Sequence, residues 1–475
     1  MLLQFAQTAL LILVVIAVFN MIIFVHELGH YWAAKWRGLK IDRFQIWFGK
    51  PIWSKTINGV QYGLGWIPAG GFVALPQMAP MEAIEGGNLD REALPPVKPL
   101  DKIIVAFAGP LFSFLLAVVA SLCVWGLGKP ADMLETTTIG YVEVGGAGEA
   151  AGLKAGDKIL AINDNPVSTW VGTLDCVVLN IATSRGDKIK FSIDRPGEGV
   201  LTKFSGFKIP ETKKWHRAGI RTVGLEPQGK GPVTIGAFSG ENAPAQRAGL
   251  LVGDEIVSVN GAAATSVPQV VDSIKASGEK PVEFVYRRAG KEATATVTPL
   301  VPVSGQEKGE VRPLIGLAPD QDAYVRAGLI NPNPVDQLTE TVKTMWITIT
   351  SVISRDSSIG LQHLSGPIGI GKVQYNFLLM DHPVLRIIAF LVLININLAI
   401  LNLMPFPVLD GGHIVLACME WIAKRPVRVK LLEYIQLCFV FLLFGVMLYV
   451  SSKDLFDDFG RGGDVPKRGK LVFPE

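Results

Sequence analysis

Four long runs along the chain carry no charged side chain and consist almost entirely of apolar residues. They are residues 1–25, 103–127, 387–409 and 434–452. A helix of about 20 apolar residues crosses roughly 30 Å of hydrocarbon, so each run is close to or above the length that spans a bilayer. The first run is too long for a signal-peptide core and lacks a basic segment before it, so we interpret it as a retained transmembrane helix.

The region between the second and third runs has a different pattern, with short strand-like stretches punctuated by glycine. Within it, the sequence of residues 151–163 recurs at residues 248–260, an offset of 97 residues. In both copies a Gly-Asp turn precedes a strand that ends in an Asn-Asp or Asn-Gly turn. A period of this length predicts two copies of one small domain rather than a solenoid.

Two further stretches predict elements outside these runs. Residues 53–64 alternate around Asn58-Gly59, the strongest short signal for a β-hairpin, and a second strand-like run follows at residues 71–75. Residues 334–353 place apolar side chains at helical spacing. This spacing predicts an amphipathic helix, packed against the protein's own core or, as the second option, lying on the membrane.

Composition and charge narrow the class of protein. Hydrophobic residues make up 49% of the 475 residues and charged residues 18%, whereas about a quarter is usual for a soluble protein. This composition excludes a disordered chain and an ordinary cytosolic enzyme. The net charge of +3 argues against a nucleic-acid partner, and four cysteines without a CxxC pair exclude a disulfide framework.

The positions of Lys and Arg predict the orientation in the membrane. Basic residues are concentrated in the short loops after the first and third runs, at residues 35–55 and 424–430. The positive-inside rule places both loops in the cytoplasm, which puts the N-terminus, residues 128–386 and the C-terminus outside. Three basic residues in the tail, Lys467, Arg468 and Lys470, conflict mildly with this orientation.

The first apolar run ends in His26-Glu27-Leu28-Gly29-His30, an HExxH pattern. Residues four apart share one helix face, so both imidazoles can reach one metal ion, and Glu27 is close enough to take a proton from metal-bound water. Ionisable side chains within a membrane helix are rare and usually functional. We therefore interpret the pattern as a metal site rather than a chance match or a structural polar cluster.

Zinc suits two neutral imidazoles, and a catalytic zinc site takes a third protein ligand while leaving one position for water. One candidate is Asp410, which follows the third apolar run and is placed by two prolines and a Gly-Gly turn at the membrane depth of the two histidines. The other candidates are the acidic residues of the loop after the first run: Asp42, Glu82, Glu85, Asp90, Glu92 and Asp101.

These motifs resemble those of the site-2 protease family of intramembrane zinc metalloproteases. The resemblance rests on HExxH in the first span, on NxxPxPxLDG at residues 402–411 and on the repeated GLxxGD element between spans two and three. The repeat itself resembles the PDZ domain, a module that binds peptides by adding a strand to a sheet edge. The fold class implied is a polytopic α-helical membrane protein of four transmembrane helices, with a membrane-associated β element and two tandem mixed α/β PDZ domains.

The resemblance also implies roles for individual residues. His26, His30 and Asp410 are implied to bind Zn²⁺, and Glu27 to act as the catalytic acid and base. Asn402 is implied to contact the substrate or the developing oxyanion.

A strand that pairs with unwound substrate is implied at Gly71, Phe72, Val73, Ala74 and Leu75. Span two carries Gly109 to Ser113, similar to the family's GxxxN element but with serine in the last position. Small residues at this spacing serve plain helix packing equally well, so the role of Ser113 stays open.

The predicted organisation has ten segments. They are transmembrane helix 1 with HExxH (1–36), a cytoplasmic-side loop with β-hairpin and edge strand (37–102), transmembrane helix 2 (103–127), a first PDZ domain (128–225), a second PDZ domain (226–318), an amphipathic linker (319–386), transmembrane helix 3 with LDG (387–409), a cytoplasmic loop (410–433), transmembrane helix 4 (434–452) and a tail (453–475).

By the same resemblance, the protein is expected to be a zinc metalloendopeptidase of the bacterial inner membrane. Its expected substrates are single-span membrane proteins, such as an anti-sigma factor, already cut once by another protease; their cleavage releases a cytoplasmic signal of the sigma-E stress response. The PDZ domains, on the periplasmic side, are expected to gate entry by binding a peptide or the substrate ectodomain. The lipid bilayer is the other expected partner.

Three alternatives come from other classes of protein. A non-catalytic, membrane-anchored PDZ scaffold would make the HExxH pattern incidental. A zinc transporter would also place His and Asp in membrane helices, although the PDZ pair has no evident role there. A different membrane zincin, which cuts soluble loops, would draw its third ligand from outside span three.

Overall fold

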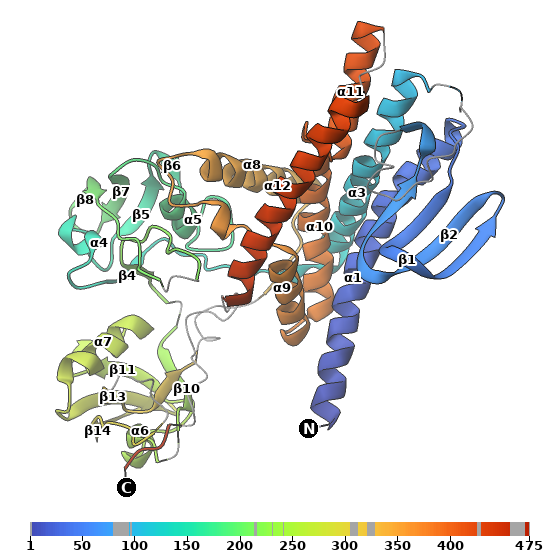
Figure 1. Cartoon of the computed structure of the whole chain (residues 1–475). Coiled ribbons are helices and arrows are strands. Elements are labelled where there is room, and N and C mark those ends of the chain that lie inside the picture. Colours follow the sequence, from blue (N-terminus) through green and yellow to red (C-terminus); the bar gives the residue numbers. More distant parts are fainter. Residues whose placement is uncertain are drawn as a thin grey trace. The chain divides into compact units, whose positions relative to one another are not determined.

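The computed structural model describes residues 2–78, 95, 97–212, 216–229, 231–240, 242–304, 312–320, 328–424, 429–456 and 471–474. They form two compact units, each assembled from separate stretches of the chain (Figure 1). The first unit takes residues 1–130, 330–346 and 364–460, and the second takes residues 131–329, 347–363 and 461–475.

Four helices of the first unit are long and apolar enough to cross a membrane, which confirms the four predicted spans. They are α1 (Leu2–Trp36), α3 (Pro99–Leu127), α10 (Pro383–Asn402) and α12 (Val429–Phe456). Helix α3 packs against both α1 and α10. Gly29 makes the close approach of α1 to α3 possible, because a Cβ there would collide with the carbonyl oxygen of Ala108.

The third span ends earlier than predicted. Helix α10 stops at Asn402 rather than at residue 409, and the chain turns through residues 403–409 before α11 (Asp410–Ala423) begins. Pro405 and Pro407 explain the break, because proline removes a backbone donor and disfavours helix at the preceding residue. The segment predicted as a loop at 410–433 therefore begins with a 14-residue helix.

The predicted linker at 319–386 is more structured than expected. The amphipathic helix predicted at 334–353 is confirmed as α8 (Pro334–Ile353). It is followed by a 3₁₀ turn, η2 (Leu361–His363), and by a second helix, α9 (Pro367–Leu379), which the sequence analysis missed. Helix α9 packs against α10 and α12.

The predicted hairpin is longer than the sequence indicated. It consists of β1 (Arg43–Ile57) and β2 (Val60–Ala74), joined at Asn58 and Gly59, whose φ angles of 53° and 81° suit a tight hairpin turn. The expected separate strand at 71–75 is the end of β2, with Leu75 outside it, and the 3₁₀ turn η1 (Pro76–Met78) follows.

The end of β2 lies at the edge of this sheet. Residues 43–46 pair with residues 71–74, Arg43 opposite Ala74 and Ile46 opposite Gly71, and on their other side with residues 61–64. Within the described residues, 71–74 have no strand partner other than 43–46. One side of this last stretch is therefore left without a strand.

In the second unit, both copies of the sequence repeat fold into the same order of elements. The first copy contains β4 (Ile139–Val142), α4 (Ala147–Ala150), β5 (Lys158–Ile162), β6 (Asn165–Pro166), α5 (Val177–Ala182), β7 (Ile189–Arg195), β8 (Gly199–Ser205) and β9 (Leu225–Pro227). The second contains β10 (Val233–Phe238), α6 (Pro244–Arg247), β11 (Glu255–Val259), β12 (Ala262–Ala263), α7 (Val267–Ser277), β13 (Val282–Arg288), β14 (Lys291–Val297) and β15 (Leu317–Pro319). The short strands β3 (Lys129–Pro130) and β16 (Leu329–Ile330) flank this region in the chain. We refer to the two copies as the first and second repeat domains.

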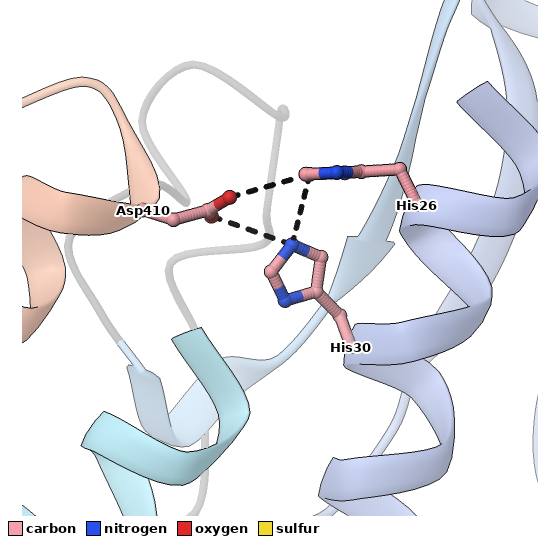
Figure 2. A group of neighbouring side chains, drawn as sticks. All are labelled: His26, His30 and Asp410. Carbon is pink, nitrogen blue, oxygen red and sulfur yellow. Dashed lines mark hydrogen bonds and ion pairs between the residues drawn. The ribbon is translucent and has the colours of Figure 1, made fainter. Parts of the chain in front are cut away.

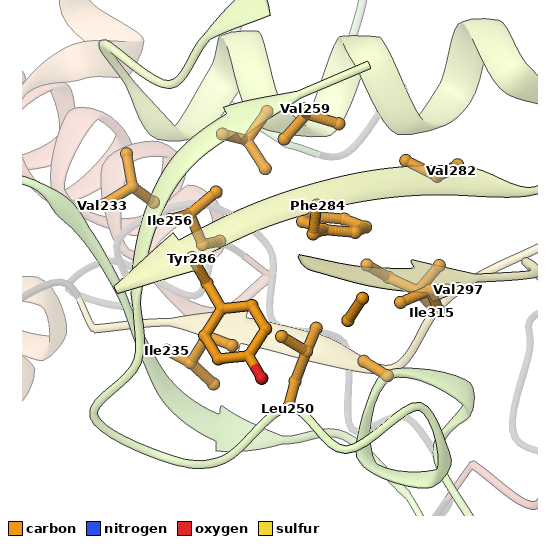
Figure 3. Packing of buried hydrophobic residues seen from close by; sticks show 13 residues of the cluster. Val233, Ile235, Leu250, Ile256, Val259, Val282, Phe284, Tyr286, Val297 and Ile315 are labelled. Atoms are coloured by element: carbon orange, nitrogen blue, oxygen red, sulfur yellow. The ribbon is translucent and has the colours of Figure 1, made fainter. Parts of the chain in front are cut away.

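Each repeat domain has its own hydrophobic core. In the second domain, the inward-facing residues of β10, β11, β13 and β14 pack around Phe284, Leu250 and Ile256 (Figure 3). The corresponding core of the first domain contains Phe191, Ile159 and Ile193. Buried and less buried residues alternate along the strands, as in β7, because successive side chains of a strand point to opposite faces. One face of each sheet therefore supplies the core.

The repeated Gly-Asp turn carries the same ion pair in both domains. In the first, Arg195 donates to both carboxylate oxygens of Asp157, at 2.7 and 2.9 Å, and to the carbonyl oxygen of Gly152 at 2.7 Å. Burial alone would raise the pKa of Asp157, but the hydrogen bonds from Arg195 and from the backbone of Lys154 hold it below its usual range. The stabilisation from this pair is therefore complete above the ordinary carboxyl pKa and lost as the pH falls through the lowered one.

Candidate active site

Three side chains converge on one point between α1 and the start of α11. The Nε2 atoms of His26 and His30 lie 3.3 Å apart, and the Asp410 carboxylate oxygens lie 3.2 Å from the first and 3.3 Å from the second (Figure 2). Helical spacing puts the two histidines on one face of α1, and the break after α10 brings Asp410 opposite them. The three residues together have the arrangement of a metal site.

The donor atoms fit a tetrahedral zinc ion. Ligand distances of about 2.0–2.1 Å at a tetrahedral angle separate neighbouring ligand atoms by about 3.3 Å, which the three observed distances match. The Nδ1 of His30 lies 2.8 Å from the carbonyl oxygen of Val105, to which it donates. This bond leaves the Nε2 lone pair facing His26 and Asp410, an arrangement that a cation stabilises.

His26 is supported in a similar way. Its Nδ1 lies 3.0 Å from the hydroxyl oxygen of Ser113, which is fully buried on α3. Ser113 is the residue whose role the sequence left open, and the structure places it directly behind His26. The polar atom that supports His30, by contrast, is a backbone carbonyl, so no side chain in the sequence marks it.

Gly109 has a role that its spacing did not reveal. It faces the site from α3, and a Cβ there would overlap the Nε2 of His30. The glycine therefore leaves room for the imidazole, in addition to any part in helix packing. A small residue four positions before Ser113 was the only signal of this in the sequence.

The other predicted side chains lie at the same place. Glu27 and Asn402 both line a cavity of about 400 Å³ that contains His26, His30 and Asp410. The amide nitrogen of Asn402 lies 3.4 Å from the Nε2 of His26. His413 also lines this cavity.

The edge of the β element forms one wall of the cavity. Of the five predicted strand residues, all but Ala74 line it, and Gly70 and Phe48 do so as well. The backbone of Val73 is hydrogen-bonded to Glu27. A Cβ on Gly71 would lie 3.1 Å from Ile23 and 3.2 Å from the carbonyl oxygen of Gln45, so glycine lets this strand run close to α1.

The alternative third ligands do not approach the histidines where they are described. Asp101 accepts a hydrogen bond from Arg37 at 2.7 Å, and Asp42 lies 3.7 Å from Lys40. The remaining candidates, Glu82, Glu85, Asp90 and Glu92, lie outside the described residues. Within the described chain, Asp410 is the carboxylate that groups with the two HExxH histidines as a possible metal ligand.

Comparison with known proteins identifies the family. Residues 14–446 match the model of peptidase family M50. The chain belongs to this family. The M50 match covers all four membrane helices in whole or in part, together with the HExxH and LDG motifs, so the chain is a metalloprotease.

Several relatives of this M50 chain are similar over nearly their whole length. A putative zinc metalloprotease of Vibrio cholerae is 28% identical over 87% of this chain and 91% of the relative. The regulator of sigma-E protease RseP of Salmonella typhimurium is 28% identical, over 93% and 96%. Among solved structures, the PDZ domain of an SdrC-like protein from Listeria monocytogenes is 24% identical over 20% of this chain and 92% of that domain, with a TM-score of 0.16.

Removing the Ser113 hydroxyl is expected to weaken zinc binding. Ser113→Ala leaves the Nδ1 of His26 without its partner, and loss of such a supporting bond typically costs 10–100-fold in metal affinity. A chelator-competition titration of the purified chain measures this, and Ser113→Thr, which keeps a hydroxyl, restores affinity if it fits the site.

Ser121→Ala is the matched control for this change. Ser121 is also buried on α3, but its hydroxyl donates to the carbonyl oxygen of Val118 within the same helix, at 2.8 Å. Zinc affinity is expected to be unchanged in this variant. Equal affinities of Ser113→Ala and the unmodified chain would show that Ser113 does not position His26.

Proposed function

We propose that the chain is a zinc metalloprotease that cleaves the transmembrane segment of single-span membrane proteins. The observation that carries this proposal is that the HExxH residues lie on a membrane-spanning helix and share one cavity with Asp410 and an edge strand. The names of the relatives support zinc as the metal.

The proposed roles follow from the positions of the side chains. His26, His30 and Asp410 hold the ion. Zinc, when bound, activates a water molecule and polarises the scissile carbonyl. Glu27 takes a proton from the attacking water and delivers it to the leaving amine, and the Asn402 amide donates a hydrogen bond to the carbonyl oxygen as it gains charge.

The edge strand addresses a difficulty of proteolysis in a membrane, which is that a helical substrate must unwind before it can be cut. A transmembrane helix satisfies its own hydrogen bonds, so unwinding it leaves bare amides in an apolar medium. Gly71, Phe72 and Val73 offer the side of β2 that has no strand partner within the same cavity wall, and we propose that Ala74 and Leu75 continue this surface. Strand addition there would satisfy the unwound substrate and present its carbonyl to the metal site.

We further propose the orientation and cellular role. The basic loops at residues 35–55 and 424–430 support a cytoplasmic position for the catalytic end of α1, with the repeat domains in the periplasm. The name of the Salmonella relative, regulator of sigma-E protease, supports a role in sigma-E regulation, and we propose an anti-sigma factor as the substrate in a stress response. Membership of a peptidase family does not favour the non-catalytic scaffold, and no observation favours a zinc transporter.

Mapping the cleavage site tests the central proposal. The purified chain, reconstituted in liposomes with a single-span substrate whose ectodomain has been removed, is expected to cut within the apolar stretch, as measured by mass spectrometry of the products. A control substrate carries the same flanks around a polar, water-soluble segment. Cuts confined to the flanks in both substrates would contradict intramembrane cleavage while leaving metalloprotease activity intact.

The repeat domains are proposed to be PDZ domains that gate substrate entry. Replacing residues 131–328 with a short Gly/Ser linker is expected to let the chain cleave a substrate that still carries its ectodomain, at a rate within about tenfold of the trimmed substrate. The trimmed substrate serves as the control in both chains. Loss of cleavage of both substrates, with zinc still bound, would instead support capture of the substrate by these domains.

A further inference from the structure

The last described residues of the chain are packed into the second unit. Leu471 and Phe473 are only 3% and 2% exposed, whereas Val472 and Pro474 between and after them are half-buried. This alternation is that of a strand with one face against a core. The family match ends at residue 446, so this segment lies beyond it.

Backbone hydrogen bonds hold the segment to the second repeat domain. The amide of Val303 donates to the carbonyl oxygen of Val472 at 2.7 Å, and the amide of Val472 donates to the carbonyl oxygen of Ser304 at 3.3 Å. The pairing is an antiparallel bridge. In Figure 1 the C-terminal segment lies beside α6 of this domain.

The side chains enter a site shaped by two glycines. Leu471 and Phe473 form a cluster with Ala243, against which Phe238, Leu300 and Leu314 also pack. Gly240 has a φ of 111°, and a Cβ there would collide with the carbonyl oxygen of Leu471. Gly316 has a φ of 68°, and a Cβ there would lie 3.0 Å from the ring of Phe473.

This site differs from the edge of the described sheet at β15, where a further strand could be added. The cluster contains no residue of α7, and within the described chain β15 pairs only with β10. Within the described residues, the docked segment therefore neither pairs with β15 nor packs in one cluster with α7.

We propose that the second repeat domain carries a peptide-docking site for the chain's own C-terminal segment, residues 471–474. The ligand class is an extended apolar peptide with two large side chains at alternate positions, here Leu471 and Phe473.

Peptide binding to a truncated chain tests the site. The full membrane chain ending at residue 466 is mixed with a fluorescent peptide of residues 467–475. We expect saturable binding by this chain and at least tenfold weaker binding by the untruncated chain, whose site is filled. Hydrogen exchange checks that residues 300–304 are as protected in the truncated chain as in the untruncated chain. If they are, and the truncated chain shows no saturable binding, the proposed site is wrong.

Variants of the peptide distinguish specific docking from nonspecific hydrophobic binding. Phe473→Asp in the peptide is expected to abolish binding, because the ring is buried, while Val472→Ala keeps it within about threefold because that side chain lies on the other face. Equal binding of both variants would contradict the proposed geometry.

Discussion

A Glu27→Gln chain is expected to bind zinc normally and to cleave its substrate at least about a thousandfold more slowly. Glutamine has nearly the same shape but cannot take a proton from the attacking water, and general acid–base groups typically contribute 10²–10⁴-fold to rate. Glu27 lines the cavity beside His26, His30 and Asp410, the proposed metal ligands, without being one of them. Activity should therefore be lost while the metal content is kept.

The measurement combines zinc content with cleavage of a liposome-embedded substrate. Glu340→Gln is the matched control, because it makes the same chemical change on α8, outside the cavity-lining residues. A Glu27→Gln chain that cleaved the substrate at the rate of this control would exclude Glu27 as the acid and base.

Asp410→Ala is expected to lose both zinc and activity. Removing one of three ligands should weaken zinc affinity by at least about a hundredfold, the upper end of what the loss of a supporting group costs. Cleavage should fall to background at zinc concentrations that saturate the unmodified chain. Chelator competition and the substrate assay measure the two effects on the same preparation.

Asp101→Ala serves as the control and as a test of the alternative ligand set. Asp101 was a candidate ligand from the sequence; in the structure it lies in the first turn of α3 and pairs with Arg37. We expect its replacement to leave zinc affinity unchanged. Loss of zinc from Asp101→Ala but not from Asp410→Ala would reverse the assignment of the third ligand.

The features that the sequence predicted are those that depend on local pattern. Apolar runs predicted the spans, Asn58-Gly59 predicted the hairpin turn, and the duplicated Gly-Asp motif predicted two domains with the same order of elements. The HExxH spacing predicted that His26 and His30 share one helix face. The prolines before Asp410 indicated that this carboxylate is held in a fixed position.

What the sequence did not predict depends on contacts between distant segments. The carbonyl of Val105 is invisible in a sequence because every residue has one, and Gly109 looks like any packing glycine until His30 lies beside it. The same prolines that marked Asp410 also end α10 at Asn402, which the continuous apolar run concealed. The docked segment at 471–474 has too few residues for its alternation to be recognised.

The separation in sequence between the two halves of the proposed metal site has a thermodynamic consequence. His26 and Asp410 belong to helices that meet only in the folded bundle, so an ion bound to both acts as a reversible cross-link closing a loop of more than 380 residues. Because the unfolded chain rarely brings these ligands together, the free energy of metal binding adds to the stability of the fold. Chelation should therefore loosen the helix bundle, and free zinc in the membrane's surroundings would help to set how much of the enzyme is assembled.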